Sequence, residues 1–208
     1  MNKIVNKLFL LSLVLTMMSC GTTPKEVNIN EINKVLTSLA EVYTAEFDNN
    51  GPDDVTKIDY SVRHLYIMYP QKFVIDQNSP FIKINESEVN NAVQEIFLTP
   101  ISEPQNTNEI DYKNNFYQFM PSTSDIKTFC IVDKIEKQVG DTVNVSACVY
   151  SVDINWKGDI NNKSQWQTID SENIPTVYKE LKARLLITDD NKYKVLEYGN
   201  INNSEFEL

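Results

Sequence analysis

The sequence predicts an α+β fold in which about three N-terminal helices pack on a curved antiparallel sheet of about four to six strands. Two observations lead to this prediction. In the first half of the chain apolar residues recur every three or four positions, and in the second half they alternate with polar residues. The first period is typical of an amphipathic helix and the second of a strand with one buried face. Because short turns separate most of the strand candidates, consecutive strands are expected to run antiparallel.

Three amphipathic helices are expected in the first half of the chain. Their predicted N-cap residues are Asn28, Asp53 and Asn85. The first helix is expected over about 31–47, where Asn49-Asn50-Gly51-Pro52 ends the apolar pattern. The second helix is expected to end at Pro70.

The strand candidates lie mostly in the second half of the chain. Two short candidates are 73–75 and 81–84, and the longer ones are 113–120, 126–137, 141–156, 177–188 and 193–201. A long polar loop over 157–175 interrupts this series. Three helices followed by such a meander predict that the helices cover one face of the sheet.

The hairpin around Gly140 allows a register to be predicted. If Gln138-Val139-Gly140 forms a three-residue loop, Gly140 falls at the left-handed position that a bulged hairpin needs. Cys130 and Cys148 then lie directly opposite each other, in a non-hydrogen-bonded pair with Cα atoms about 4.5 Å apart. In an oxidising compartment this pairing predicts a Cys130–Cys148 disulfide. The alternative is two reduced cysteines that act as small hydrophobic residues.

In the second strand of this hairpin the apolar residues change to the other face after Cys148. From there on, the apolar side chains lie on the same side as this cysteine: Tyr150, Val152, Ile154 and Trp156. Two explanations are open. A β-bulge interrupts the strand, or a long bent strand is covered by different elements at its two ends.

The first nineteen residues have the features of a secretory signal. Lys3 and Lys7 form a basic head, and the uncharged stretch Leu8–Met18 is eleven residues long. Because a membrane-spanning helix needs about 20 apolar residues, this stretch is read as a signal peptide. Ser19 follows this stretch, and Cys20 comes next, before Gly21. The alternative is an ordinary secreted protein with a chance cysteine.

The stretch Met17-Met18-Ser19-Cys20 resembles the lipobox of bacterial lipoprotein signal peptides, with Met17 where that family prefers Leu. The resemblance implies cleavage before Cys20, a diacylglycerol on its thiol and acylation of the new N-terminus. It implies a bacterial envelope location, and Gly21 in place of Asp favours the outer membrane under the sorting rule of enteric lipoproteins. The expected organisation is a signal peptide over 1–19, a lipidated tether over 20–29 and a single α+β domain over 30–208.

The charge of the chain excludes some partners. The full sequence carries 19 basic and 29 acidic side chains, and the part after the signal has 17 and 29, a net charge of −12. Such an acidic balance argues against nucleic acid as a partner. The expected partners are the membrane, through the N-terminal lipid, and an unknown envelope protein or small ligand.

The sequence contains no catalytic or metal-binding motif. His64 is its only histidine, which excludes sites built from several histidines, and its five glycines form no phosphate-binding loop. No cofactor, metal or catalytic residue is therefore predicted. The acidic pairs Asp53-Asp54 and Asp189-Asp190 occupy expected cap or turn positions.

The order of elements over about 30–201 resembles the NTF2-like cone and its cystatin-like relatives. Enzymes of that family use Asp, His or Tyr side chains inside the cavity, and Asp59, Tyr60 and His64 are the nearest candidates here. They match no family motif, so no role is transferred to them.

Aromatic residues offer a candidate binding surface. Trp156 and Trp166 flank the long polar loop, and exposed aromatic rings bind sugars and peptides well. The alternative is that these rings cover the ends of the sheet. The sequence thus predicts a lipid-anchored envelope lipoprotein that is a non-enzymatic ligand- or protein-binding module. The alternatives are a small-molecule enzyme with a conical NTF2-like cavity and a structural spacer.

Overall fold

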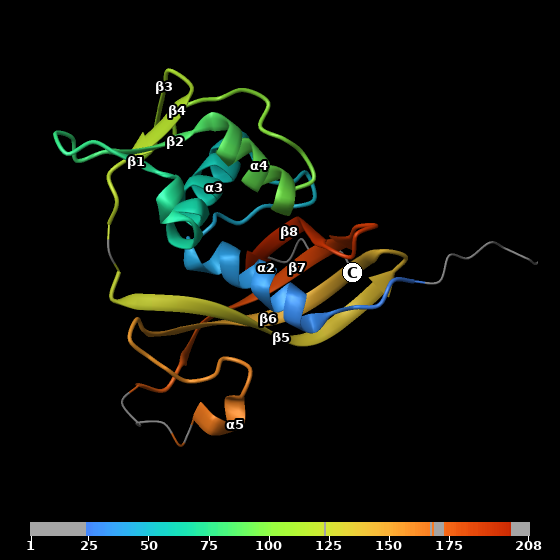
Figure 1. Ribbon diagram of the computed structural model, residues 1–208. Coiled ribbons are helices and arrows are strands. Elements are labelled where there is room, and N and C mark those ends of the chain that lie inside the picture. Colours follow the sequence, from blue (N-terminus) through green and yellow to red (C-terminus); the bar gives the residue numbers. More distant parts are fainter. Residues whose placement is uncertain (1–23, 123, 167, 169–172, 201–208) are drawn as a thin grey trace, which may run out of the picture.

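The computed structural model describes residues 24–122, 124–166, 168 and 173–200 (Figure 1). The predicted lipidation site, Cys20, lies outside these residues. Over the described residues the fold is α+β, as predicted, with two antiparallel four-stranded sheets instead of one. The strand orders are β1-β2-β4-β3 in the small sheet and β5-β6-β7-β8 in the main sheet.

The elements follow the predicted order, with a different end for α2, two strands in place of 113–120 and an additional helical turn in the loop 157–175. The helices are α2 (Ile29–Glu41), α3 (Asp54–Met68), α4 (Glu86–Ile96) and the single turn α5 (Lys163–Trp166). The small sheet consists of β1 (Val74–Ile75), β2 (Ile82–Asn85), β3 (Asp111–Lys113) and β4 (Phe116–Phe119). The main sheet consists of β5 (Ile126–Val139), β6 (Thr142–Asp153), β7 (Thr176–Ile187) and β8 (Tyr193–Asn200). The three predicted N-caps are confirmed, because the side chains of Asn28, Asp53 and Asn85 accept hydrogen bonds from first-turn N–H groups.

Helix α2 ends earlier than predicted. Tyr43 has a left-handed backbone with φ 54°, and the Thr44 N–H donates to the Leu39 carbonyl over 3.0 Å. This is a Schellman ending, in which the left-handed position is usually a glycine. Because a tyrosine occupies it here, the sequence pattern did not indicate the stop. Phe47, expected inside the helix, instead forms an antiparallel bridge with Tyr198 of β8.

The main core lies between α2 and the inner face of the main sheet. Ile32, Leu36 and Leu39 of α2 are fully buried against it. The sheet contributes mainly Cys130, Val132, Val143, Val145, Ala147, Val149, Leu181, Ala183, Leu185, Ile187, Val195 and Tyr198. This alternation is the predicted one for β6 and β7, and it makes α2 the cover of the inner face.

Helix α2 also satisfies the open edge of the main sheet. The Asn33 side-chain oxygen accepts a hydrogen bond from the Val132 N–H, and Thr37 Oγ1 accepts one from the Cys130 N–H, both over 2.8 Å. Among the described strands β5 lies at the edge of the sheet, so these N–H groups have no described neighbouring strand to bond with. The helix thus covers the sheet with its apolar side chains and closes its edge with its polar ones.

A second core joins α3 and α4 to the small sheet. Its buried residues are Ile58, Val62, Leu65, Phe73, Ile82, Ile84, Val89, Ala92, Ile110, Tyr117 and Phe119. The predicted single strand over 113–120 is wrong. Asn114 and Asn115 have φ of 53° and 64°, which makes a tight turn between β3 and β4. Two consecutive left-handed residues are the geometry of a type I′ hairpin turn, and asparagine tolerates it.

The predicted register of the β5–β6 hairpin is wrong. Val139 pairs with Thr142, so the turn has two residues, Gly140-Asp141, although Gly140 does take a left-handed φ of 57°. Two irregularities in β5, at Glu136 and at Asp133, then shift the pairing. As a result Cys148 faces Ile131, and Cys130 faces Val149.

The predicted Cys130–Cys148 disulfide is contradicted by this register. Side chains of consecutive strand residues point to opposite faces, so a shift of one position separates the two thiols. Cys130 lies in the main core, whereas Cys148 lies on the outer face of the sheet. Both are free and buried, which is the reduced alternative.

Different elements cover the two faces of the hairpin, and this explains the change of apolar face after Cys148. Val143, Val145 and Val149 of β6 face the main core. Tyr150 and Val152 belong to a third cluster on the outer face, together with residues of the 154–166 segment. Different elements therefore cover the two faces of β6, and the pairing of β6 with β7 is also irregular between Val149 and Tyr150, so the structure contains features of both explanations.

Replacing Thr37 by Val tests the role of α2 at the sheet edge. The variant keeps the shape of the side chain but leaves the buried Cys130 N–H without its acceptor. We expect the free energy of unfolding to fall by about 1–3 kcal/mol. Urea unfolding, followed by tryptophan fluorescence, measures the loss. Thr37→Ser keeps the oxygen and should lose clearly less; equal losses in both variants would contradict the role of the hydrogen bond.

Candidate functional site

The predicted tryptophan surface is buried. Trp156 and Trp166 are each 5% exposed, and their ring centroids lie 5.9 and 5.6 Å from that of Phe129. The Trp166 indole N–H donates to the Asp159 carbonyl over 2.8 Å. The two rings are therefore not an exposed platform. They fill a small core because the outer face of the main sheet is itself apolar and must be covered.

The three candidate residues of α3 do not converge on one site. Tyr60 is 1% exposed inside the main core, with its hydroxyl 3.1 Å from Ser38 Oγ. The His64 ring stacks on Tyr60 at 5.3 Å. Asp59 accepts a hydrogen bond from Thr107 Oγ1 over 2.7 Å, and burial raises the pKa of its carboxyl. Tyr60 and His64 thus contact each other, whereas Asp59 bonds to the 98–110 loop.

The acidic pairs occupy cap and turn positions, as predicted. Asp53 caps α3, and Asp54 accepts hydrogen bonds from the Ser102 N–H and from Lys57 Nζ. Lys57 also donates to the Pro100 carbonyl, so this ion pair fastens the 98–110 loop to α3. Within the part of the chain that the structure describes, no group of three or more His, Cys, Asp or Glu side chains could hold a metal ion.

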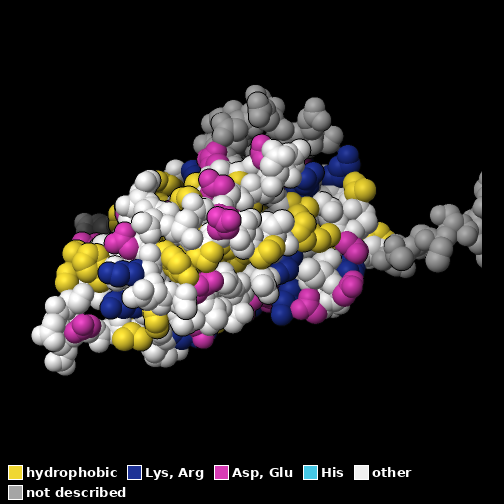
Figure 2. Space-filling view, turned by 90° about the horizontal axis from the view of Figure 1, so that it is seen from above, with side chains coloured by type: hydrophobic (Ala, Val, Ile, Leu, Met, Phe, Trp, Pro, Cys, Tyr) yellow, Lys and Arg dark blue, Asp and Glu magenta, His cyan; other side chains and the backbone are white. Residues whose placement is uncertain are grey.

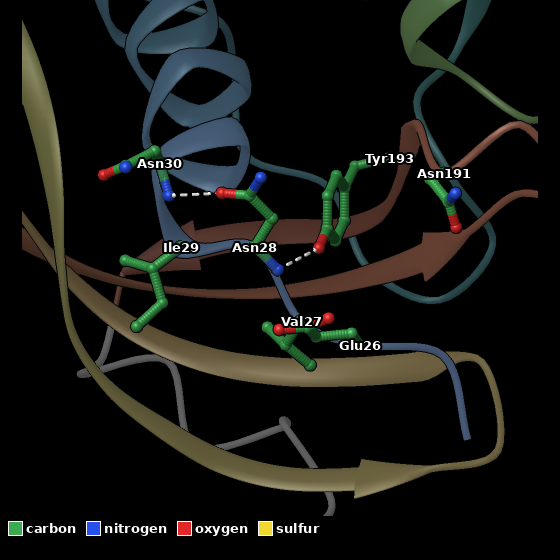
Figure 3. A pocket seen from close by; sticks show the side chains of 7 residues that line it. All are labelled: Glu26, Val27, Asn28, Ile29, Asn30, Asn191 and Tyr193. Atoms are coloured by element: carbon green, nitrogen blue, oxygen red, sulfur yellow. Dashed lines mark hydrogen bonds between the residues drawn. The ribbon is translucent and has the colours of Figure 1, made fainter. Parts of the chain in front are cut away.

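Two open hollows lie on the surface over the main sheet. One, of about 570 Å³, is lined by Glu26, Val27, Asn28, Ile29, Asn30, Asn191 and Tyr193 (Figure 3). The other, of about 420 Å³, is lined by Asn30, Asn33, Ile131, Val132, Asp133, Ile160, Asn161 and Lys163. Both open to solvent, and most of their lining residues are polar. The second lies at the edge where α2 meets β5, outside the core that buried side chains fill between this helix and the sheet.

A thiol, a carboxylate and an ammonium group meet beside the second hollow. Cys148 Sγ donates to an Asp133 carboxylate oxygen over 2.8 Å, and Lys163 Nζ lies 3.3 Å from the other oxygen. Burial and the Asp133 charge raise the pKa of the Cys148 thiol to about 11. Since the thiolate is the nucleophile of cysteine chemistry, this thiol is inert near neutral pH.

An exposed apolar surface remains at the end of α3 and on β1. The exposed apolar side chains of this region are Ile67, Met68, Tyr69, Val74 and Ile75, with exposed fractions from 41% to 72%. Val74 and Ile75 are consecutive and point to opposite faces of β1, and we call the whole group the β1 patch. Hydrophobic side chains gather at the end of the molecule where β1 and β2 lie (left in Figures 1 and 2). Strand β1 is also an edge strand, with β2 on one side and no described strand on the other.

Aromatic residues that adjoin the β1 patch in the chain pack against one another. The ring centroid of Tyr66 lies 5.6 Å from that of Phe73 and 5.5 Å from that of Phe119. Both contacts are edge-to-face. These contacts hold the end of α3 against the small sheet. The sequence did contain a signal for the patch, because Ile67 and Met68 fall outside the apolar face of the predicted helix.

Comparisons with protein-family models, with curated proteins and with solved structures gave no match to this chain. No helix among the described residues has the length and apolar character needed to cross a bilayer.

Acid should weaken the fold partly through His64. Burial holds the pKa of its imidazole below the ordinary value, because desolvation disfavours the charged ring. As the pH falls through about 6.5, the unfolded chain takes up a proton that the folded chain does not, so the free energy of unfolding decreases. His64→Phe keeps a ring on Tyr60 but cannot titrate.

Urea midpoints at about pH 7.5 and about pH 5 measure this effect. We expect the unsubstituted protein to lose more stability on acidification than His64→Phe, since all other titrating groups are common to both. The same pH dependence in the two proteins would show that His64 does not contribute.

Proposed function

We propose that this chain is a bacterial lipoprotein, held at the outer membrane through acyl chains on Cys20, whose folded domain binds a protein partner. The observation that carries the proposal is the uncharged stretch Leu8–Met18 followed directly by Ser19-Cys20-Gly21. Each buried methylene contributes about 0.8 kcal/mol, so one acyl chain binds weakly and two or more hold stably. Cys130 and Cys148 are buried inside the domain, which leaves Cys20 as the cysteine for this chemistry.

The filled core supports a binding module over an enzyme. A small-molecule enzyme of the NTF2-like type would need an open cavity with convergent polar groups. Here Tyr60, Phe97 and Tyr198 fill the space beneath α2, each 1% exposed or less. The cone-like arrangement remains part of the proposed function in one respect: α2 packs on the four-stranded main sheet.

The β1 patch supports a protein as the partner. Exposed apolar side chains lose contact with water when another surface covers them, and the free backbone of an edge strand pairs with an extended segment. Ile75, with 72% of its surface exposed, has the largest exposed fraction of the patch. The partner is accordingly an envelope protein that presents an extended, apolar segment to β1.

The first test of this function concerns the anchor. Cys20→Ala removes the thiol, so the protein should lose the added mass of the acyl chains and leave the membrane fraction. Intact-mass spectrometry and fractionation of cells measure both effects. Cys148→Ala is the matched control and should stay lipidated. Unsubstituted protein from native membranes without acyl chains on Cys20 would disprove the proposal.

The second test concerns the β1 patch. Ile75→Lys places a charge in the patch, and the captured partner should fall by about tenfold or more, equivalent to about 1.4 kcal/mol of binding free energy. Val139→Lys is the matched control, since Val139 is 63% exposed at the opposite end of the molecule. Quantitative capture from cross-linked envelopes gives the comparison. Equal capture by the two variants would reject the β1 patch as the binding surface.

A further inference from the structure

The first described residues of the tether are fixed to the domain. Lys25 Nζ lies 2.9 Å from an Asp189 carboxylate oxygen, 3.1 Å from one of Asp141, and 3.2 Å from the Ile187 carbonyl. The Lys25 carbonyl accepts a hydrogen bond from the Gln138 amide over 2.8 Å. The hydrogen bond to Asp189 raises the pKa of the Lys25 ammonium, so it stays charged at neutral pH.

The next residues continue this attachment into α2. Val27 packs against the main core, and the Asn28 N–H donates to the Tyr193 hydroxyl over 2.6 Å (Figure 3). The Asn28 side chain also caps α2. The chain from Lys25 to the helix, which the sequence predicts as part of a tether over 20–29, is therefore held against the domain.

Both carboxylates that hold Lys25 belong to the turns of the main sheet. Asp141 lies in the β5–β6 turn, and Asp189 lies in the turn between β7 and β8. We call these two turns, Gly140–Asp141 and Thr188–Lys192, the hairpin end. In Figure 1 the N-terminal chain leaves the domain at this end (right), and β1 and β2 lie at the other (left).

Few residues separate the proposed lipidation site from the hairpin end. Three residues, Gly21 to Thr23, separate Cys20 from Pro24. At about 3.5 Å for each residue, the Cα atom of Cys20 lies within about 14 Å of that of Pro24. A lipid on Cys20 thus brings the hairpin end close to the bilayer surface.

We propose that the hairpin end faces the lipid headgroups and that the β1 patch points away from the membrane. This inference rests on the proposed lipidation of Cys20. The charges of the hairpin end do not produce the orientation, because Asp141, Asp189 and Asp190 outnumber Lys25 and Lys192 in these contacts. The orientation comes from a short covalent anchor and from the ion pairs of Lys25.

Quenching by labelled lipid headgroups tests the orientation. The native lipidated protein is placed in vesicles of phosphatidylethanolamine and phosphatidylglycerol, with a nitroxide quencher on some headgroups. A fluorophore is attached through Val139→Cys, next to the hairpin end, or through Gln77→Cys in the exposed β1–β2 loop. Cys130 and Cys148 are buried, and the unsubstituted protein gives their background labelling.

Quenching should be several-fold stronger at position 139 than at position 77. Lys25→Ala releases the tether, so the difference between the two positions should shrink. Lys34→Ala is the matched control, because Lys34 forms its described ion pair within α2, with Glu31, and its replacement should leave the difference unchanged.

The outcomes separate this inference from the proposed function. Lipidated protein that floats with the vesicles but is quenched equally at both positions, or more at position 77, would overturn the orientation alone. Unchanged quenching in Lys25→Ala would overturn the role of the lysine. Absence of acyl chains from the mass of the protein would overturn the lipidation and the orientation together.

Discussion

The packing of α2 across the main sheet is the contact on which the rest of the structure depends. Ile32, Leu36 and Leu39 fill the inner face, while Asn33 and Thr37 bond to the open backbone of β5. One helix therefore provides the apolar core and closes a sheet edge. Without it the same four strands would expose an apolar face and an unpaired strand, the two features that drive aggregation.

The segment between α2 and β5 closes the other edge of the main sheet. Phe47 bridges to Tyr198, and Phe97 bridges to Val195, both on β8. The rings of Phe47 and Phe97 also contact each other at 5.9 Å, and Phe97 contacts Tyr60 of α3 at 5.2 Å. The small sheet and its helices are thus tied to the main core through β8 instead of forming an independent unit.

What could be predicted from the sequence was local. The caps at Asn28, Asp53 and Asn85 and the left-handed Gly140 depend on residues a few positions away, and the structure confirms them. The α+β class followed from two clear periodicities. The small sheet could not be predicted in this way, because β2 pairs with β4 across a helix and a long loop.

The errors at the candidate site also arise because neighbouring residues in the sequence do not determine the outcome. The irregularities of β5 at Glu136 and Asp133 involve polar residues, which leave no mark on the apolar alternation, yet they move Cys130 and Cys148 to opposite faces. Trp156 and Trp166 are buried because they cover Phe129 and Tyr150, which lie on the outer face of the main sheet. Sequence spacing alone does not show which of two apolar faces a loop will cover.

The two ends of the molecule differ in a way that suits an anchored binding protein. The hairpin end combines ion pairs with the attached tether, whereas the β1 patch offers apolar side chains and a strand of only two residues. Such a small surface would bind weakly between freely diffusing proteins, because association costs freedom of motion. If both partners are held at one membrane, the effective concentration rises to about the millimolar range, and a weak contact suffices. The short tether and the modest patch are then parts of one arrangement, in which the membrane supplies the proximity and the patch supplies the recognition.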